Sequence, residues 1–320
     1  MDLLTFGPVV AYVFPTRDAR NLDHYVVVAK ATFDLRSGEP TDDPEPIHTT
    51  AVAFGDLHTT SLRMDDDLAP IKPNADIWVD ATARAPRGKP SQRWDVRMRI
   101  GALERRLAIT GPRAWVKTVL GYELSDPQPA LEVPLRYERA FGGVAGDAVC
   151  EENPIGTGFV ADRDRPDVVI APQIESPEDP IGAIGRVHAP CGTLPLHKSW
   201  LPRRAQAGTF DARWRETRSP RLPEDFSPAF YNAAHPDFVY DGYLRGDETI
   251  ELAGVAERTL SFRLPGCVTS VTTRPESALS PLLLDTLFVD ADGARAAMTW
   301  RCSFPMERPV GVVAVHVRRG

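Results

Sequence analysis

The chain has 320 residues, enough for one large domain or two domains of medium size. Its apolar fraction of 42% and charged fraction of 25% are those of a globular protein with a hydrophobic core. A formal net charge of -7 argues against nucleic acid or an anionic membrane as the main partner. The 30 prolines remove backbone donors and break helices, so they favour short strands joined by long connections.

The N-terminus and the cysteines indicate a cytoplasmic protein. The first twenty residues are apolar, but Asp2, Pro8 and the lack of a basic start distinguish them from a secretory signal. No apolar run reaches the length that spans a membrane. The four cysteines are Cys150, Cys191, Cys267 and Cys302. They lie far apart without a C-x-x-C pair, so we expect reduced thiols, and neither a zinc ribbon nor a disulfide framework.

Alternation of apolar and polar residues predicts strands in the first half of the chain. The first runs from His24 to Leu35, and its three consecutive valines are apolar on both faces, which is typical of a strand near the centre of a sheet. Residues 94–100 and 103–109 form a predicted antiparallel hairpin around Gly101-Ala102. Further strands are expected at 77–86, with Ile77, Val79 and Ala81 on one face, at 114–119 and at 131–143.

Strand patterns return in the last third of the chain. They cover 249–255, 258–266, 268–275, the two sides of an Asp292-Gly293 turn within 282–304, and a final valine-rich strand after 310. About ten short strands predict an all-β fold, an antiparallel sandwich or barrel-like core with one or two short helices. We expect one β-rich domain over 1–320. Its alternative division is an N-terminal sheet (1–143), an irregular platform (144–237) and a C-terminal sheet (238–320).

The stretch from 195 to 237 interleaves aromatics, prolines and charges without a helical or strand period. It is too long for an ordinary loop and too aromatic for a disordered linker, so it predicts an ordered platform laid across the β-scaffold. Ser227 and Pro228 suit the cap and first position of a helix over 229–235. Arginines beside aromatics fit a protein-binding face, or internal ion pairs such as Asp211 with Arg213.

Patterns for catalysis, cofactors and metals are weak. The glycines at 156–158 and 182–185 lack the rest of a nucleotide-binding loop, and no G-x-S-x-G elbow occurs, so we expect no cofactor. The histidines lack zinc spacing and Asp65-Asp66-Asp67 lacks calcium-loop spacing, so we expect no metal and interpret the three aspartates as a solvated acidic loop. Cys191 with His188 or His197 is a weak candidate for a nucleophile pair.

Several longer motifs occur together in a fixed order. They are KPNADIWV (72–79), PLRYERAFGG (134–143), ENPIGTGF (152–159), SWLPRRAQAGTFDARW (199–214), RSPRLPEDFSPAFYNAAHPD (218–237), RGDETIEL (245–252), DTLFVDAD (285–292) and TWR (299–301). In this combination, which covers nearly the whole chain, the sequence resembles a bacterial domain-of-unknown-function family encoded beside type VI secretion genes.

The resemblance implies a cytoplasmic adaptor or chaperone without enzymatic activity. Such a protein binds a secreted effector and helps to load it onto the spike, meaning the VgrG trimer or its PAAR-type tip. The segment 134–237 is then the expected docking surface. Its candidate binding residues are Arg136, Glu138, Phe141, Trp200, Arg203, Arg204, Asp211 and Trp214.

Two other functions stay open from the residues. One is a hydrolase or carbohydrate-acting enzyme on a β-sandwich, with Glu138, Asp211 or Glu224 in a groove, because sandwich folds host both enzymes and binding modules. The other is a purely structural partner of the spike that makes no contact with an effector.

Overall fold

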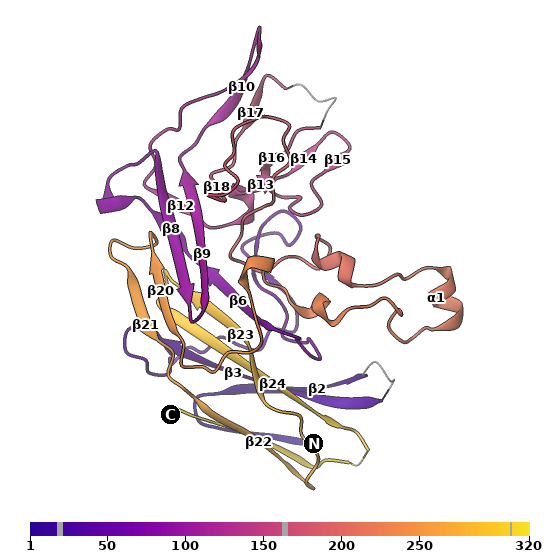
Figure 1. Ribbon diagram of the computed structural model, residues 1–320. Coiled ribbons are helices and arrows are strands. Elements are labelled where there is room, and N and C mark those ends of the chain that lie inside the picture. Colours follow the sequence, from indigo (N-terminus) through magenta and orange to yellow (C-terminus); the bar gives the residue numbers. More distant parts are fainter. Residues whose placement is uncertain (18–21, 162–165, 308) are drawn as a thin grey trace.

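β-Strands form nearly all of the regular structure, as the sequence predicts (Figure 1). The computed structural model describes residues 1–17, 22–161, 166–307 and 309–320. Over this part of the chain there is one α-helix, α1 (Ala212–Thr217). The short 3-10 helices are η1 (Pro86–Gly88), η2 (Tyr137–Arg139), η3 (Arg203–Gln206), η4 (Pro228–Tyr231) and η5 (Pro236–Phe238). None of these helices is long and apolar enough to cross a membrane.

The larger of two main sheets has six strands. In spatial order they are β19 (Val239–Tyr240), β6 (Ala75–Asp80), β23 (Leu283–Asp290), β24 (Arg295–Pro305), β3 (Asp23–Asp34) and β2 (Val10–Arg17). The three valines of β3 are fully buried between β24 and β2, so the predicted interior strand is confirmed. β23 and β24 form the hairpin expected around Asp292-Gly293. β6 and β23 run parallel, so the sheet is mixed rather than purely antiparallel.

The second main sheet has five antiparallel strands. In spatial order they are β18 (Ile174–Glu175), β9 (Leu103–Thr110), β8 (Arg93–Ile100), β20 (Thr249–Ala253) and β21 (Leu260–Arg263). β8 and β9 are the predicted hairpin, and the apolar side chains of β8 are buried while its charged ones are exposed. Buried side chains of both main sheets merge into one hydrophobic core. Each main sheet combines strands from both ends of the chain, so the strands of 1–143 and 238–320 do not form separate sheets.

Two three-stranded sheets lie at opposite ends of the molecule (Figure 1). One consists of β1 (Asp2–Phe6), β25 (Val312–Arg318) and β22 (Val268–Arg274), and joins the main core through the buried valines of β25. The other consists of β11 (Gly121–Leu124), β10 (Ala114–Thr118) and β17 (Val168–Ile170), and covers a second, smaller core. The sequence pattern predicts neither β1 nor β2, because the first seventeen residues lack a clear alternation.

Four two-stranded ladders complete the sheets. They are β4 (Val52–Ala53) with β5 (Leu62–Met64), β7 (Thr82–Arg84) with β12 (Glu132–Pro134), β13 (Phe141–Gly142) with β16 (Thr157–Gly158), and β14 (Val144–Ala145) with β15 (Ala148–Val149).

Two of the predicted strands are interrupted. The strand expected at 77–86 changes partner at Ala81, since β6 pairs with β23 and β7 pairs with β12. The strand expected at 131–143 ends after β12, where η2 begins. There the Tyr137 amide donates to Ser61 Oγ at 2.9 Å, and the Ser61 amide donates to Glu138 at 2.9 Å. These contacts with a distant segment override the local alternation.

The predicted helix over 229–235 is wrong beyond its first turn. Ser227 does cap the segment, since its Oγ accepts a hydrogen bond from the Ala229 amide at 3.3 Å. However, only the 3-10 turn η4 forms, and it ends at Tyr231. The Asn232 side chain and the Ala233 amide instead donate to the buried carboxylate of Asp76, each at 2.9 Å. The helix therefore ends at Tyr231, because Asn232 and Ala233 bond to Asp76 of β6 instead of continuing the helical hydrogen bonds.

Candidate protein-docking surface

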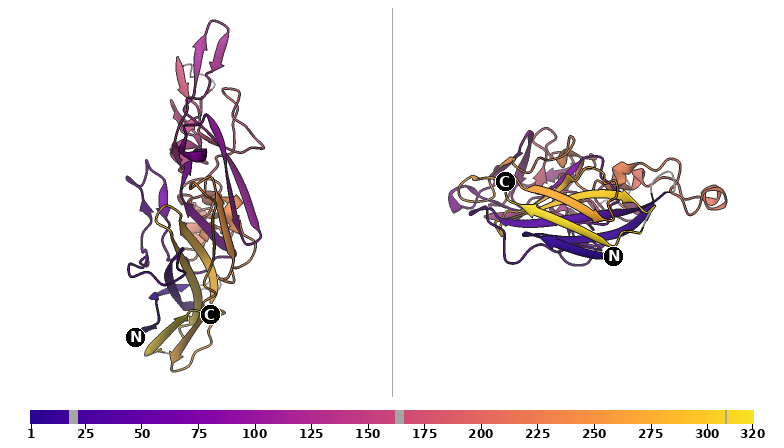
Figure 2. Two further views of the ribbon diagram at one scale, coloured as in Figure 1. Left: turned by 90° about the vertical axis from the view of Figure 1, so that its left-hand side faces the viewer. Right: turned by 90° about the horizontal axis from the view of Figure 1, so that it is seen from below.

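Residues 207–226 leave the body of the molecule as a projecting arm with α1 at its tip (Figures 1 and 2). The two legs of the arm are bonded to each other at its base, where the Ser227 amide donates to the Gln206 carbonyl at 3.0 Å. Further out, the Thr209 amide and hydroxyl donate to the carboxylate of Asp225 at 2.9 and 2.7 Å. The expectation of a platform laid across the β-scaffold is thus wrong for residues 207–226.

Arg203 anchors the outgoing leg of the arm. Arg203 is only 4% exposed, and its Nη2 donates to the carboxylate of Asp65 at 2.6 Å. Its Nη1 and Nε donate to the carbonyls of Leu196 and Phe230 at 2.8 and 2.9 Å. One guanidinium therefore bonds a carboxylate of the body and both sides of the arm root, which is the geometry that five donors in a rigid fork allow.

The aspartates beside this anchor do not form a solvated loop, so that interpretation is wrong. Asp65 and Asp67 are each 3% exposed, and the carboxylate of each has its own cation. Asp65 takes the arm-root arginine, Asp67 lies 2.6 Å from the buried Lys30 of β3, and Asp66 pairs with Lys198. A buried charge requires such a partner. The three consecutive residues thus connect the arm root to the main sheet.

Asp76 of β6 anchors the returning leg. It is fully buried, and its carboxylate accepts from Lys72 Nζ at 2.7 Å as well as from Asn232 and Ala233. Both legs therefore end on buried charged groups of the body. Such an arrangement fixes the direction in which the arm projects.

The tip of the arm is built around Trp214. Asp211 caps α1 by accepting from the Trp214 amide at 2.7 Å. Its expected ion pair with Arg213 is not formed. The indole Nε1 donates to the Arg221 carbonyl at 2.8 Å, which bonds the helix to the returning leg. The ring of Phe210 packs edge-on against the indole, with ring centroids 4.8 Å apart.

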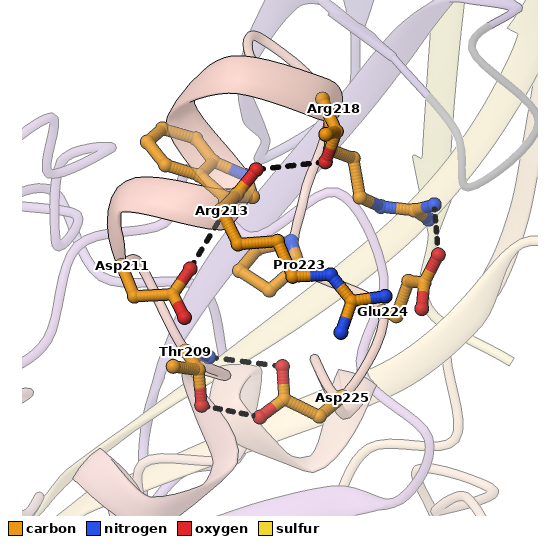
Figure 3. Close-up of a pocket in the computed structure, with 9 residues that line it drawn as sticks. Thr209, Asp211, Arg213, Arg218, Pro223, Glu224 and Asp225 are labelled. Atoms are coloured by element: carbon orange, nitrogen blue, oxygen red, sulfur yellow. Dashed lines mark hydrogen bonds and ion pairs between the residues drawn. The ribbon is translucent and has the colours of Figure 1, made fainter.

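A pocket of about 240 Å³ opens at the tip, between α1 and the returning leg (Figure 3). Arg218 pairs with Glu224 at 3.3 Å on its rim. Hydrogen bonds from Thr209 hold the pKa of Asp225 below its ordinary value, so this carboxylate stays ionised. Arg213 reaches into the pocket, and its guanidinium makes no hydrogen bond or ion pair with any residue in the described ranges.

Exposed apolar and cationic side chains share this tip. Phe210 is 52% exposed and Leu222 is 36% exposed. The tip carries four arginines and four carboxylates over residues 209–226, so its net charge is zero. The sequence argument missed Phe210 and Leu222 as candidate contact residues, although both stand in its aromatic and proline-rich stretch. Exposed aromatic side chains beside arginine are the residue types that dominate protein interfaces.

The other predicted site residues differ in how deeply they are buried. Phe141 and Trp200 are 3% and 6% exposed and pack edge-on against His188 and Tyr137, so they support the fold together with Arg203. Arg204 lies on the surface, 2.9 Å from Glu151.

Arg136 and Glu138 contact residues of the body. The guanidinium of Arg136 is stacked 3.6 Å above the ring of Phe54, and both carboxylate oxygens of Glu138 accept from Ser61. Of the eight predicted residues, the structure brings only Asp211 and Trp214 together at the arm tip.

Two of the three carboxylates proposed for an enzyme line one pocket, and the third does not. Asp211 and Glu224 line the tip pocket, where one caps α1 and the other pairs with Arg218, whereas Glu138 lies in the body. Burial raises the pKa of the Cys191 thiol to about 12, so it stays protonated at neutral pH and is a poor nucleophile. In the described ranges, no group of three His, Cys, Asp or Glu side chains could hold a metal ion.

Among known proteins, the chain is similar to a family found in bacteria. No curated protein and no solved structure matches it. A family model described as an uncharacterized protein conserved in bacteria (DUF2169) matches residues 20–301. This range is most of the sequence and includes the arm, the five-stranded sheet and the six-stranded sheet except β2 and the end of β24. The chain therefore belongs to the bacterial family DUF2169.

Proposed function

We propose that this protein is a cytoplasmic adaptor of a type VI secretion system, which binds a secreted effector and helps to load it onto the VgrG or PAAR-type spike. The secretion assignment rests on the motif resemblance described above. The docking role rests on one structural observation, the projecting arm with a fixed root and an exposed aromatic and arginine-rich tip.

The shape of the arm suits recognition of another protein. Its backbone is held by its own hydrogen bonds and its root by buried ion pairs, so little ordering entropy remains to be lost on binding. An exposed segment that only connected two strands would not need a capped helix and an indole hydrogen bond at its far end. Phe210, Leu222 and Arg213 are the side chains that the tip offers to a partner.

The test is a pull-down of the tagged protein from bacteria that express the secretion system, with mass spectrometry of the proteins that co-purify. The arm is removed in one variant by replacing residues 208–225 with a short Gly-Ser linker. This linker can close the chain because Gln206 and Ser227 are already hydrogen-bonded at 3.0 Å. A matched control carries Val119→Ser and Leu120→Ser at the β10–β11 turn, where both apolar side chains are almost fully exposed, at 102% and 97%.

The proposal expects an effector or a spike protein with the wild type and with the control, and its loss from the arm-deleted variant. Phe210→Ala with Leu222→Ala should weaken capture by at least tenfold, because truncated interface hot spots cost about 2 kcal/mol or more. Equal capture by the arm-deleted variant would contradict the docking role of the arm. Recovery of no secretion protein at all would contradict the adaptor function and favour an enzyme.

A further inference from the structure

Strand β22 (Val268–Arg274) is the outer strand of the three-stranded sheet at the end of the molecule that holds both termini (Figure 1). Its sequence, VTSVTTR, combines β-branched residues of high strand propensity and has no charge before its last residue. On one side it pairs with β25 over all seven residues. On its other side, no strand of the described residues pairs with it, so that side is a free edge.

The register shows which backbone groups lie on that free edge. The Asp2 amide donates to the Gly311 carbonyl at 2.7 Å, and β1 pairs in parallel with β25, so alternate residues of β25 from Val313 onward face β1. The intervening residues of β25 face β22, where their partners are Val268, Ser270, Thr272 and Arg274. The N–H and C=O groups of Thr269, Val271 and Thr273 therefore point outward. No backbone or side-chain group in the described ranges bonds to them.

The other free edges among the described strands are shorter or protected. β2 has eight residues but contains Pro15, and β21 and β11 have only four each. Natural sheets protect an exposed edge with proline, charge or short length, because an unprotected edge pairs with other strands. β22 has none of these protections between Val268 and Thr273. Its free edge can therefore pair with a strand of another molecule.

We propose that β22 pairs with β22 of a second copy of this chain, antiparallel and around a two-fold axis at Val271. The three outward residues are placed symmetrically about Val271, so Thr269 of one copy meets Thr273 of the other, and Val271 meets Val271. Each of the three contributes one N–H and one C=O, and every one of these groups finds its complement in the second copy. The two three-stranded sheets become one continuous sheet across the dimer.

The side chains, like the backbone groups, can be accommodated in this pairing of two copies. On the exposed face Ser270 lies opposite Thr272 of the second copy, and Val268 lies opposite Arg274. No like charges face each other, and the stem of Arg274 covers a valine that is 56% exposed in the single chain. On the inner face Val271, which packs against the main core, meets its own counterpart. A second copy of the chain thus supplies hydrogen-bond partners for the outward N–H and C=O groups of β22 without a clash of charge.

The test uses two double variants that differ only in the sign of one charge. Ser270→Lys with Thr272→Lys places lysines opposite each other at two symmetric positions, whereas Ser270→Lys with Thr272→Glu places opposite charges there. Both positions are exposed, so both variants should fold with the thermal transition of the wild type. Sedimentation velocity over a concentration series measures the dimer. We expect the Lys/Lys variant to dimerise about tenfold more weakly than the Lys/Glu variant, or worse.

Hydrogen exchange gives a second measurement on the wild type alone. The outward amides of Thr269, Val271 and Thr273 should exchange fast at low concentration and become protected as the dimer forms. The amides of Ser270 and Thr272 should be protected throughout, because they bond to β25. A wild-type protein that stays monomeric at its highest soluble concentration would overturn the proposal. Equal dimerisation of the two double variants would overturn it too.

Discussion

Replacing Arg203 with Ala tests whether the arm root holds the arm to the body. The change removes three hydrogen bonds and leaves the 3%-exposed Asp65 without its cation. Breaking a buried ion pair in this way costs about 3–5 kcal/mol. The neighbouring Arg204 supplies the control, because its ion pair with Glu151 is exposed, with side-chain exposures of 47% and 53%. Its loss should cost about 0–1 kcal/mol.

Urea unfolding followed by circular dichroism measures both variants, and limited trypsin digestion reports on the arm itself, whose tip carries four arginines. Arg203→Ala should lower the unfolding midpoint and speed cleavage in the arm, while Arg204→Ala should do neither. A double variant, Asp65→Asn with Arg203→Met, should recover part of the loss, since no unpaired charge remains buried. If the two single variants unfold at the same urea concentration, the buried anchor is not what holds the arm.

Three further predictions concern the body of the molecule. Gly192→Ala should destabilise the fold by about 1–3 kcal/mol, because a Cβ there would lie 2.2 Å from the Tyr137 ring, while Gly182→Ala, with nothing within 4 Å, should be neutral in a thermal melt. Burial alone would raise the pKa of Glu45, but a hydrogen bond from His48 and nearby cations outweigh it and lower the pKa to about 2. Its folded pKa thus lies below its unfolded value of about 4.3, so about 3 kcal/mol of stability is present above pH 4.3 and is lost as the pH falls toward 2. Glu45→Gln should remove that acid-dependent loss, which urea titrations at a series of pH values measure as the change in the free energy of unfolding with pH. The same dependence on pH in the variant and the wild type would contradict the assignment. Cys191, whose pKa burial raises to about 12, should resist alkylation at pH 8 until the protein unfolds, and rapid labelling of the native protein would show otherwise.

Where alternation was long and uninterrupted, the sequence was sufficient to predict the strand. The β8–β9 hairpin and strands β22 and β25 follow from it directly, because the two-residue period reports which face of a strand is buried. Strand β3 and the β23–β24 hairpin, which are buried on both faces, follow instead from consecutive apolar residues and from the Asp292-Gly293 turn. The all-β class followed from these elements and from the prolines. The cap at Ser227 was also predictable, since capping is a contact between near neighbours in the chain.

Only the tertiary structure decided which arginines and aspartates are buried. Arg203 and Arg204 are adjacent and chemically identical, yet one is enclosed by Asp65, Leu196 and Phe230 and the other faces solvent. The same is true of the arm, whose helix α1 depends on a cap and an indole bond within a segment that has no helical period. Burial, ion pairing and the direction of a projecting segment depend on residues far apart in the chain, so local patterns do not contain them. The motifs identified a family, but which of their residues can reach a partner depends on how the chain folds.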